Sequence, residues 1–382
     1  MLAAGFRNCY NPDSMNSLDG AAPVVGGRVL SVADDGRVLV EGRRPEAGDG
    51  VARAIARLVV DGRLVVKLVG RWAAADRAGD LLERLEAAGS GDVARLHGRV
   101  GWRHPLLGDG TLAIVTEYLP GAEDGWTWAV DDVVSALRGA PDPGWPALLG
   151  ARVARIHDVL GADAVPSGPD APAARRARAD AALAGAVAAT QGSTGVRLRN
   201  RRAALERGIR SLDDTAPGLE FPIHGDLHVG QVLASPDATA PGGRRYTVID
   251  FDGDPQLDAA DRERADAAAR DVAHLLVSLD LVAAVAQKRL RRADPAAWAW
   301  ADRARRELLD AYRAELARSE LFDPALLPGF EAEQLAAELH YADRFLPAWR
   351  YAPDAAITHR YPSTNDHPED PWTPPPFEPT SA

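Results

Sequence analysis

The segment Phe221–Leu233 reads FPIHGDLHVGQVL and gathers hydrogen-bonding side chains into one short stretch. Two histidines, an aspartate and a glutamine fall within eight positions of it: His224, Asp226, His228 and Gln231. Such a set fits a metal site, a general-base site or a structural polar loop, and the surrounding chain must distinguish them. The two histidines have the spacing of helical zinc ligands, but Gly225 and the strand-to-loop context disfavour a helix here.

A second polar segment, VIDFDGDP at 248–255, follows the predicted strand Tyr246–Ile249. Its Asp250 and Asp252, with Gln231 of the first segment, offer hard oxygen ligands, which suit Mg²⁺ better than zinc. Asp226 then stays available to accept the proton of an attacking hydroxyl. This division of labour is what phosphoryl transfer requires. Taken alone, VIDFDGDP is equally an acidic turn.

Phosphoryl transfer also needs a cation on the nucleotide phosphates, and Lys67 in the predicted strand RLVVKLV (63–69) can supply it. Glu83 lies sixteen residues further on, in a helix predicted within 73–91, and can hold Lys67 by an ion pair. Asp80 or Glu86 can play the same part. In isolation, Lys67 is typical of an exposed strand lysine and Glu83 of a solvated helix residue.

Composition narrows the possible partners. The chain of 382 residues carries 44 basic and 55 acidic side chains, a net charge of −11, without a long basic run. This disfavours a nucleic-acid partner, because phosphate backbones need clustered Lys and Arg. Cys9 is the only cysteine, which excludes an intramolecular disulfide. With no signal-peptide pattern and no apolar run near the ~20 residues of a membrane span, we expect a cytoplasmic protein with no membrane partner. We expect it to be a monomer or a weak homodimer.

The first third of the chain is β-rich by pattern. Alternating apolar residues flank Asp34-Asp35-Gly36, and again flank Asp61-Gly62, whose type suits the positive φ of a type I′ turn. A buried strand at 112–116 is followed by the turn residues Pro120-Gly121, where one lobe is expected to end.

The remainder of the chain is predominantly helical by pattern. Apolar residues at helical spacing predict helices over 145–162 and 269–287, and the Ala- and Arg-rich stretch 161–218 predicts a helical insertion. We therefore predict three parts: an N-terminal lobe at 1–118, a C-terminal helical lobe at 119–361, and a proline-rich tail at 362–382.

Five motifs, in this order, resemble the protein-kinase-like small-molecule kinases, in the aminoglycoside phosphotransferase and maltokinase branch: VVK, ERL, TEYLPG, HGDLHVGQVL and IDFDGDP. LPGAEDGW (119–126) and DVAHLLVSLD (271–280) are especially maltokinase-like. ELHYADRFLPAWRYAP (338–353) departs from that pattern and is similar to the actinobacterial glucosamine kinases. The resemblance covers about Val24 to Pro353 and implies an α+β fold, a bilobal protein-kinase-like fold with a β-rich first lobe and a helical second lobe.

The resemblance also implies roles for individual residues. Asp226 would be the catalytic base, and His224 would orient its loop on the substrate side, together with His228, which equally fits a structural histidine. Asp250 would hold Mg²⁺, with Asp252 close by and Gln231 where many relatives have asparagine. Lys67 would contact the α- and β-phosphates of ATP, supported by Glu83. The backbone of the hinge, which consists of Glu117, Tyr118 and Leu119, would bind adenine.

Two departures from the family pattern stand out. Gln231 is one methylene longer than asparagine, which weakens the inference of direct metal contact. The glycine-rich phosphate loop is not evident, and EAGDGVA, with Gly48 and Gly50, is the nearest candidate. A Walker-type P-loop is absent from the sequence.

The acceptor is predicted from the segment that resembles glucosamine kinases. A glucosamine ammonium favours a nearby carboxylate, since charged hydrogen bonds are the stronger ones. Glu338 and Asp343 are the candidates, with Tyr341 and Trp349 as sugar-stacking surfaces; the same aromatics also fit a helix core. The sequence thus predicts an ATP- and Mg²⁺-dependent kinase forming glucosamine 6-phosphate. A maltokinase, an aminoglycoside kinase and a nucleotide- or sugar-sensing pseudokinase remain the alternatives.

Overall fold

The computed structural model describes residues 57–68, 76–104, 108–142, 144–213, 218–257 and 259–363, and the backbone of three strands within 24–40. Gly48, Gly50 and all but the first two residues of the predicted tail lie outside the described residues. The chain divides into two compact units, 1–122 and 123–382. In the described part, none of the helices is both long and apolar enough to cross a membrane.

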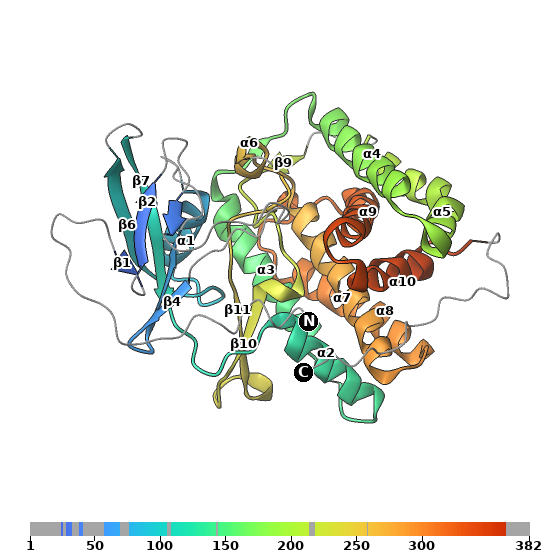
Figure 1. Cartoon of the computed structure of the whole chain (residues 1–382), viewed down its shortest axis with the longest axis horizontal. Coiled ribbons are helices and arrows are strands. Elements are labelled where there is room, and N and C mark those ends of the chain that lie inside the picture. Colours follow the sequence, from blue (N-terminus) through green and yellow to red (C-terminus); the bar gives the residue numbers. More distant parts are fainter. Residues whose placement is uncertain are drawn as a thin grey trace. The chain divides into compact units, whose positions relative to one another are not determined.

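Among its described residues, unit 1 has two antiparallel sheets and one helix (Figure 1). The smaller sheet has the order β1-β2-β3, and the larger has the order β4-β5-β7-β6. The strands are β1 Val24–Val25, β2 Arg28–Val32, β3 Val38–Val40, β4 Arg57–Val60, β5 Leu64–Leu68, β6 Leu96–His104 and β7 Gly108–Glu117. Both predicted hairpins are therefore present, as β2–β3 and β4–β5.

The turn between β4 and β5 has the predicted backbone. Asp61 and Gly62 both have positive φ, at 52° and 62°. Val60 pairs with Leu64, so Arg63 adds one residue to the loop beyond a two-residue hairpin. The register places Lys67 between Arg57 of β4 and Ile114 of β7, in the middle of the larger sheet.

The helix of unit 1, α1 Arg77–Ala87, begins later and ends earlier than the pattern limits of 73–91. Leu81, Leu82 and Leu85 form its buried face, as the spacing predicts. Gly89 follows with φ +69°, a conformation that favours glycine at a helix C-terminus.

Unit 2 is mostly helical. Its longer helices are α2 Gly125–Leu137, α3 Trp145–Leu160, α4 Ala171–Ala189, α5 Gly192–Arg210, α7 Ala268–Leu290, α8 Pro295–Glu315, α9 Leu327–Phe345 and α10 Tyr351–Arg360. The short α6 spans Ala259–Glu263. The described part of unit 2 also has two small antiparallel strand pairs. The strands β10 Val232–Pro236 and β11 Arg244–Val248 form a hairpin, whereas β8 Val165–Pro166 pairs with β9 Leu219–Glu220 across the α4–α5 helices.

Helix α7 forms the centre of unit 2. It is buried over most of its 23 residues and contacts α2, α8, α9 and α10. A helix that is apolar nearly all round must be enclosed by other elements. Helices α3 and α8 approach each other closely at Gly150, where an added Cβ would lie 2.1 Å from the carbonyl oxygen of Leu308. The elements of unit 2 that carry predicted site residues are thus packed around one buried helix.

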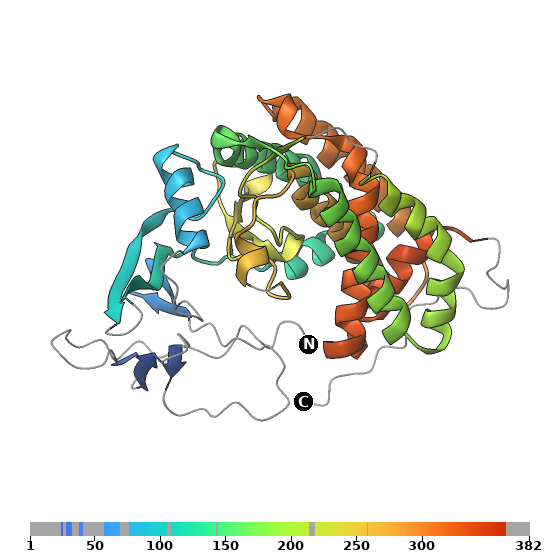
Figure 2. The same ribbon diagram turned by 90° about the horizontal axis from the view of Figure 1, so that it is seen from above.

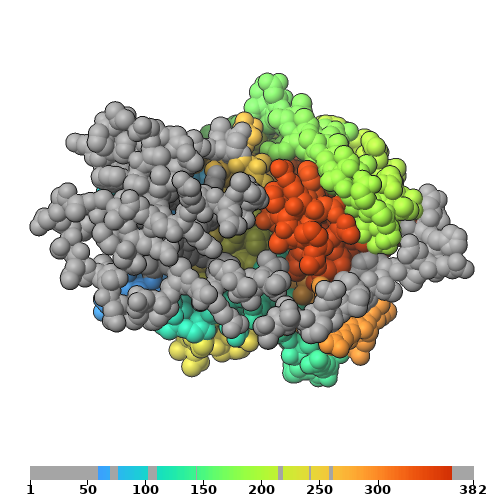
Figure 3. Space-filling model, viewed as in Figure 1, coloured from blue at the N-terminus to red at the C-terminus, as the bar shows by residue number. Residues whose placement is uncertain are grey.

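The Ala- and Arg-rich insertion forms a helical hairpin, α4–α5, as predicted. Figures 1 and 2 both show it alongside the C-terminal helices α9 and α10, and the contacts between these helices agree. In the space-filling view the orange-red surface of the C-terminal helices borders the green surface of the insertion (Figure 3). The insertion therefore supports the helix that carries Glu338.

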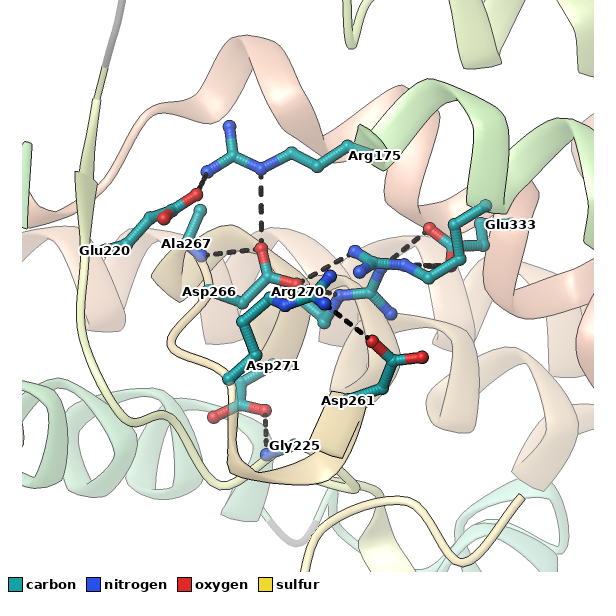
Figure 4. Close-up of polar contacts among 11 residues, drawn as sticks. Arg175, Glu220, Gly225, Asp261, Asp266, Ala267, Arg270, Asp271 and Glu333 are labelled. Carbon is teal, nitrogen blue, oxygen red and sulfur yellow. Dashed lines mark hydrogen bonds and ion pairs between the residues drawn. The ribbon is translucent and has the colours of Figure 1, made fainter. Parts of the chain in front are cut away.

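A cluster of ion pairs joins α4, β9, α7 and α9 (Figure 4); Arg175 and Glu333 are buried, and the other members are partly buried. Asp266 receives Arg270 Nε and Arg178 Nη2, both at 2.8 Å, and pairs with Arg175, which also pairs with Glu220. The amide of Asp266 donates to the carbonyl of Phe221, and the reverse bond is also present. The cluster therefore fixes the start of the segment Phe221–Leu233, called the HGD segment from here on.

Arg270 is the cation on which this cluster depends most. It donates to Asp266 and to both carboxylate oxygens of Glu333, at 2.9 Å each, and its guanidinium packs on Phe330. These partners raise the pKa of Arg270 against the opposing effect of its burial. An arginine with such partners is a permanent charge, and its removal leaves buried carboxylates short of a partner.

We predict that Arg270→Met lowers the free energy of unfolding by about 3 kcal/mol, the order expected when one partner of a buried pair is removed. The matched control is Arg202→Met, which breaks an exposed i,i+4 pair with Glu206 and is expected to cost about 0.5 kcal/mol or less. Urea unfolding at pH 7 measures both. Equal losses in the two variants would show that the cluster does not contribute.

Candidate active site

The HGD segment is held by alternate buried side chains. Phe221, Ile223, Leu227 and Val229 are each at most 2% exposed, and Gly225 between them has φ +85°. Asp271 of α7 accepts from the backbone N–H of His224 at 2.7 Å and of Gly225 at 2.8 Å. The backbone on the N-terminal side of Asp226 is therefore fixed by a buried carboxylate.

His224 connects the HGD segment with VIDFDGDP at 248–255, the second acidic segment. Its Nε2 donates to the carbonyl of Ile249 at 2.9 Å, and its Nδ1 accepts from the N–H of Asp226 at 3.3 Å. A second bond runs from the N–H of Ile249 to the carbonyl of Gln231. The imidazole is 1% exposed and packs against Phe251. Both ring nitrogens therefore bond to backbone groups, one in each acidic segment, as expected of a residue that orients the loop.

Asp226 lies at the point where several acidic groups converge. Its side chain is 17% exposed, with Gln231 Nε2 at 3.4 Å and His274 Nδ1 at 3.8 Å. Burial, and then the negative charges of Asp254, Asp250 and Glu338, raise the pKa of Asp226 well above its ordinary value. The carboxylates that oppose ionisation of Asp226 belong to the second acidic segment and to α9, both distant from Asp226 in the sequence.

The second acidic segment begins with an unusual backbone conformation. Asp250 follows β11 with φ +71°, one of three non-glycine residues with positive φ in the described part of the chain. Asp252 is half-buried nearby in sequence. Asp254 accepts from the N–H of Gln256 at 2.8 Å, and burial raises its pKa. A left-handed aspartate at a functional turn is a form of local strain that the surrounding structure must hold.

Three residues of this site are not assigned from the sequence patterns: Gln334, His274 and Asp254. Gln334 of α9 donates to Glu338 Oε1 at 3.1 Å and lies 2.9 Å from His274 Nε2. His274 stands between Asp226 and Glu338, 3.7 Å from the latter. The signals were present: His274 lies in DVAHLLVSLD, and Gln334 precedes Glu338 by one helical turn. Asp254, the third acid of DFDGD, was likewise overlooked.

The predicted sugar-side residues separate into two groups. Glu338 and Tyr341 lie near Asp226, since charges of Glu338 and Asp226 raise the pKa of Tyr341 after burial. Asp343 instead bonds Thr190 of the insertion and Arg350, and its side chain is 7% exposed. This position makes Asp343 a brace between α9 and the insertion.

The aromatic residues form a chain that reaches the HGD segment. Trp349 meets Trp126 edge-on, with ring centroids 5.3 Å apart, and Trp126 stacks on His228 at 5.7 Å. His228 Nδ1 accepts from the N–H of Gly230, and burial lowers its pKa well below the ordinary value, which keeps it neutral. Gly125 allows α2 to begin against this loop, because a Cβ there would lie 1.6 Å from the carbonyl oxygen of Val229.

The predicted nucleotide-side residues lie in unit 1. Glu83 pairs with Arg99 of β6 at 2.6 Å and is 58% exposed, so its ion pair in this structure is not the one predicted with Lys67. The N–H of Glu117 bonds the carbonyl of Arg95, and the N–H of Tyr118 bonds the carbonyl of Arg63. Leu119 is buried.

The oxygen-rich set of unit 2 fits a hard cation. Among the described residues, no three His, Cys, Asp or Glu side chains converge as a metal cage. Carboxylate and amide oxygens are the donors that Mg²⁺ takes in proteins, usually one or two of them together with waters and substrate phosphates. The carboxylates whose charges oppose ionisation of Asp226 also supply the donor chemistry that such a cation requires.

A central strand lysine in a β-rich unit, followed by a helical unit with two converging acidic segments, defines a kinase-like phosphotransferase. No protein-family model matches the chain. Over 383 aligned positions it is 35% identical to the glucosamine kinase of Streptacidiphilus jiangxiensis, covering 95% of this chain and 80% of that protein. Over 273 positions it is 41% identical to the glucosamine kinase of Mycolicibacterium smegmatis (68% and 65% covered).

Solved structures agree with these sequence relatives. A glucosamine kinase in complex with glucosamine, ADP and inorganic phosphate matches with a TM-score of 0.76 at 33% identity, covering 89% of this chain and 94% of that one. Crystal form B of a glucosamine kinase matches with a TM-score of 0.75 at 32% identity, over 90% and 93%. The chain belongs to the glucosamine kinase family. The predicted family and fold class are confirmed.

We predict that Asp226→Asn raises the melting temperature of the metal- and nucleotide-free protein at pH 8. With its pKa raised above the ordinary 3.8, Asp226 binds a proton in the folded state that the unfolded state releases, so stability is lost as pH rises through the raised value. The amide removes that loss, and we expect a gain of roughly 2–4 °C, the shift that about 1 kcal/mol produces.

The gain should shrink as the pH falls toward 4, because both forms are then neutral. Asp310→Asn, on the exposed face of α8, is the matched control and should show no such trend. Thermal unfolding in EDTA between pH 4 and pH 8 measures both variants. A gain that is equal at both ends of this range would contradict the raised pKa.

Proposed function

We propose that this protein transfers the γ-phosphate of ATP to a hydroxyl of glucosamine, forming glucosamine 6-phosphate. One observation carries the proposal: Asp226 is positioned among groups from the HGD segment, the second acidic segment and α9 at once. Membership of the glucosamine kinase family supports the acceptor, as does the match to a kinase in complex with glucosamine and ADP. The reaction is proposed to occur in the cytoplasm, with the protein as a monomer or weak homodimer.

Asp226 is the proposed base. Its raised pKa brings it closer to neutral pH, where a general base is most effective. Gln231 Nε2 donates to one of its carboxylate oxygens and orients the side chain, while His274 Nδ1 lies 3.8 Å from the other oxygen. Held this way, the carboxylate accepts a hydrogen bond from the sugar hydroxyl and takes its proton as the phosphoryl group is transferred.

Asp250 is the proposed principal ligand of Mg²⁺, with Asp252 and the free oxygen of the Gln231 amide as further donors. The Gln231 amide nitrogen faces Asp226, so its oxygen is the atom left for a cation. When bound, the cation would neutralise charge on the nucleotide phosphates. Asp254, absent from the sequence-based assignment, adds negative charge to the same region.

Lys67 is proposed to contact the α- and β-phosphates. Glu83 would have to leave Arg99 in order to support it, and its exposure makes that exchange inexpensive. For adenine, the hinge N–H groups of Glu117 and Tyr118 already serve the sheet. Adenine recognition is therefore assigned to the remaining backbone groups of the segment Glu117–Leu119.

Glu338 is the proposed partner of the glucosamine ammonium. Gln334 orients its carboxylate, and Glu338 lies on the same side of the site as Asp226. A charged ammonium placed here would offset the carboxylate repulsion, which a neutral hydroxyl does not do. Tyr341 and Trp349 are proposed as apolar surfaces for the sugar ring, and Asp343 acts indirectly through the brace it forms.

We predict that Asp226→Asn abolishes turnover, lowering kcat by at least about a hundredfold, while ATP binding changes little. An ADP-release assay with glucosamine, glucose, maltose and kanamycin in parallel measures turnover, and calorimetry with ATP measures binding. Wild-type turnover confined to maltose or kanamycin would reassign the acceptor. Unchanged turnover in the variant would remove Asp226 as the base.

We predict that Glu338→Gln raises KM for glucosamine about tenfold, the loss expected for one charge-assisted hydrogen bond, and changes use of glucose much less. The amide keeps the shape of the side chain and removes only its charge. Asp323→Asn, at a helix cap remote from the site, serves as the control. Equal losses for the two sugars would exclude Glu338 as the amine partner.

A further inference from the structure

Behind the HGD segment lies a fully buried polar relay that connects three helices of unit 2. It consists of Asp271 on α7, His157 on α3 and Tyr312 on α8. His157 and Tyr312 are 0% exposed, and Asp271 is 1% exposed. Polar groups sealed from water in this way are destabilising unless each meets a partner, so the pattern of their bonds is tightly constrained.

Asp271 receives donors on both of its oxygens. Oδ1 accepts from the N–H of Gly225, a bond drawn in Figure 4. Oδ2 accepts from the N–H of His224 and also from His157 Nε2, at 3.2 Å. Burial by itself would raise the pKa of Asp271. The hydrogen bond from His157, together with the other partners, has a larger effect, and the pKa of Asp271 is lowered. Its carboxylate therefore stays ionised as it holds the catalytic segment.

The relay also specifies the tautomer of His157. Nε2 faces a carboxylate and therefore carries a hydrogen, which leaves Nδ1 as the acceptor of the neutral ring. Tyr312 Oη lies 2.9 Å from Nδ1 and supplies that hydrogen bond, and burial raises the pKa of Tyr312 well above 10, so its hydroxyl remains protonated. The opposite tautomer would direct the lone pair of Nε2 at the carboxylate of Asp271. Phe221 meets the ring edge-on, at 5.5 Å between centroids.

We propose that His157 and Tyr312 are positioning residues for phosphoryl transfer, acting through Asp271 on the backbone that carries Asp226. The relay is continuous from Tyr312 Oη to the N–H groups of His224 and Gly225. If His157 stops donating, Asp271 keeps only its two backbone donors, so the acceptor that holds the HGD backbone is less rigidly oriented. A displacement near 1 Å at a reacting group is enough to slow catalysis by about a hundredfold.

The direct test compares His157→Gln with His157→Leu. Glutamine can place its Nε2 donor near that of histidine, whereas leucine has similar bulk without a donor. We expect kcat with glucosamine to fall about threefold or less in the glutamine variant and about tenfold or more in the leucine variant. KM for both substrates should stay within twofold of wild type. Equal kcat losses in the two variants would overturn the proposal.

Tyr312→Phe tests the tautomer with a smaller change, the loss of one oxygen. It should lower kcat by about threefold or more, because His157 is no longer held with its hydrogen on Nε2. The matched control is Tyr246→Phe on β11, which removes another buried hydroxyl, away from the relay. A Tyr312→Phe enzyme as active as the Tyr246→Phe enzyme would exclude this role for the hydroxyl.

The kcat readout rests on the proposed function, and a second readout does not. Hydrogen exchange of the His224 and Gly225 amides reports the Asp271 bonds directly, with or without turnover. We expect faster exchange in His157→Leu than in His157→Gln or wild type. If no sugar is phosphorylated by the wild type, the proposed function fails, and the exchange still decides the relay. Unchanged exchange in His157→Leu would overturn it.

Discussion

The hydrogen bond from His224 Nε2 to the carbonyl of Ile249 is the contact on which the site depends, because it joins two acidic segments that are separated by 25 residues in the chain. The β10–β11 hairpin and the bond from the Ile249 N–H to the Gln231 carbonyl bring the two segments together, and the His224 bond fixes the side of the site on which the repelling carboxylates of Asp226 and Asp250 lie. The His224 side chain that donates this bond is itself held in place. The backbone of His224 is anchored on Asp271, and its ring packs on Phe251.

Unit 2 treats its buried carboxylates in two different ways. Asp266 and Glu333 are surrounded by arginines, and Asp271 receives three hydrogen-bond donors, so each is satisfied within the fold. Asp226 meets an amide and an imidazole but also the negative charge of three other carboxylates. Electrostatic strain is thus concentrated where a cation and a nucleotide are proposed to bind, and the satisfied clusters resist the repulsion that results. This distribution is the familiar exchange of stability for function.

Helix α9 shows how structural and functional roles share one element. Glu333 faces the ion-pair cluster, while its neighbour Gln334 faces His274 and Glu338. Near its C-terminal end, Asp343 attaches the helix to the α4–α5 insertion through Thr190. An insertion far from Asp226 therefore contributes to the acceptor side of the site. It does so by packing against α9 and fixing the position of that helix, without contacting Asp226 directly.

The sequence by itself determined the family, the hairpins of unit 1, the apolar helices and the identity of the paired acidic segments. These features depend on local periodicity, turn residues such as Asp61-Gly62 and motifs at short spacing, all of which are visible along the chain. Asp226, Gln231 and Asp250 were recognisable for this reason. The described structure keeps them in one region of unit 2.

Only the tertiary structure decided which polar residues face which. In the sequence, nothing distinguishes His157 and Tyr312 from other helix positions, yet in the structure they are bonded to each other. The sequence offers Asp343 and Glu338 equally as amine partners, whereas in the structure Asp343 bonds Thr190 and Arg350. Glu83, expected beside Lys67, meets Arg99 of the neighbouring strand. Such choices are made by the crossing and rotation of helices and strands over long separations, and a one-dimensional pattern records the face of a residue but not its partner.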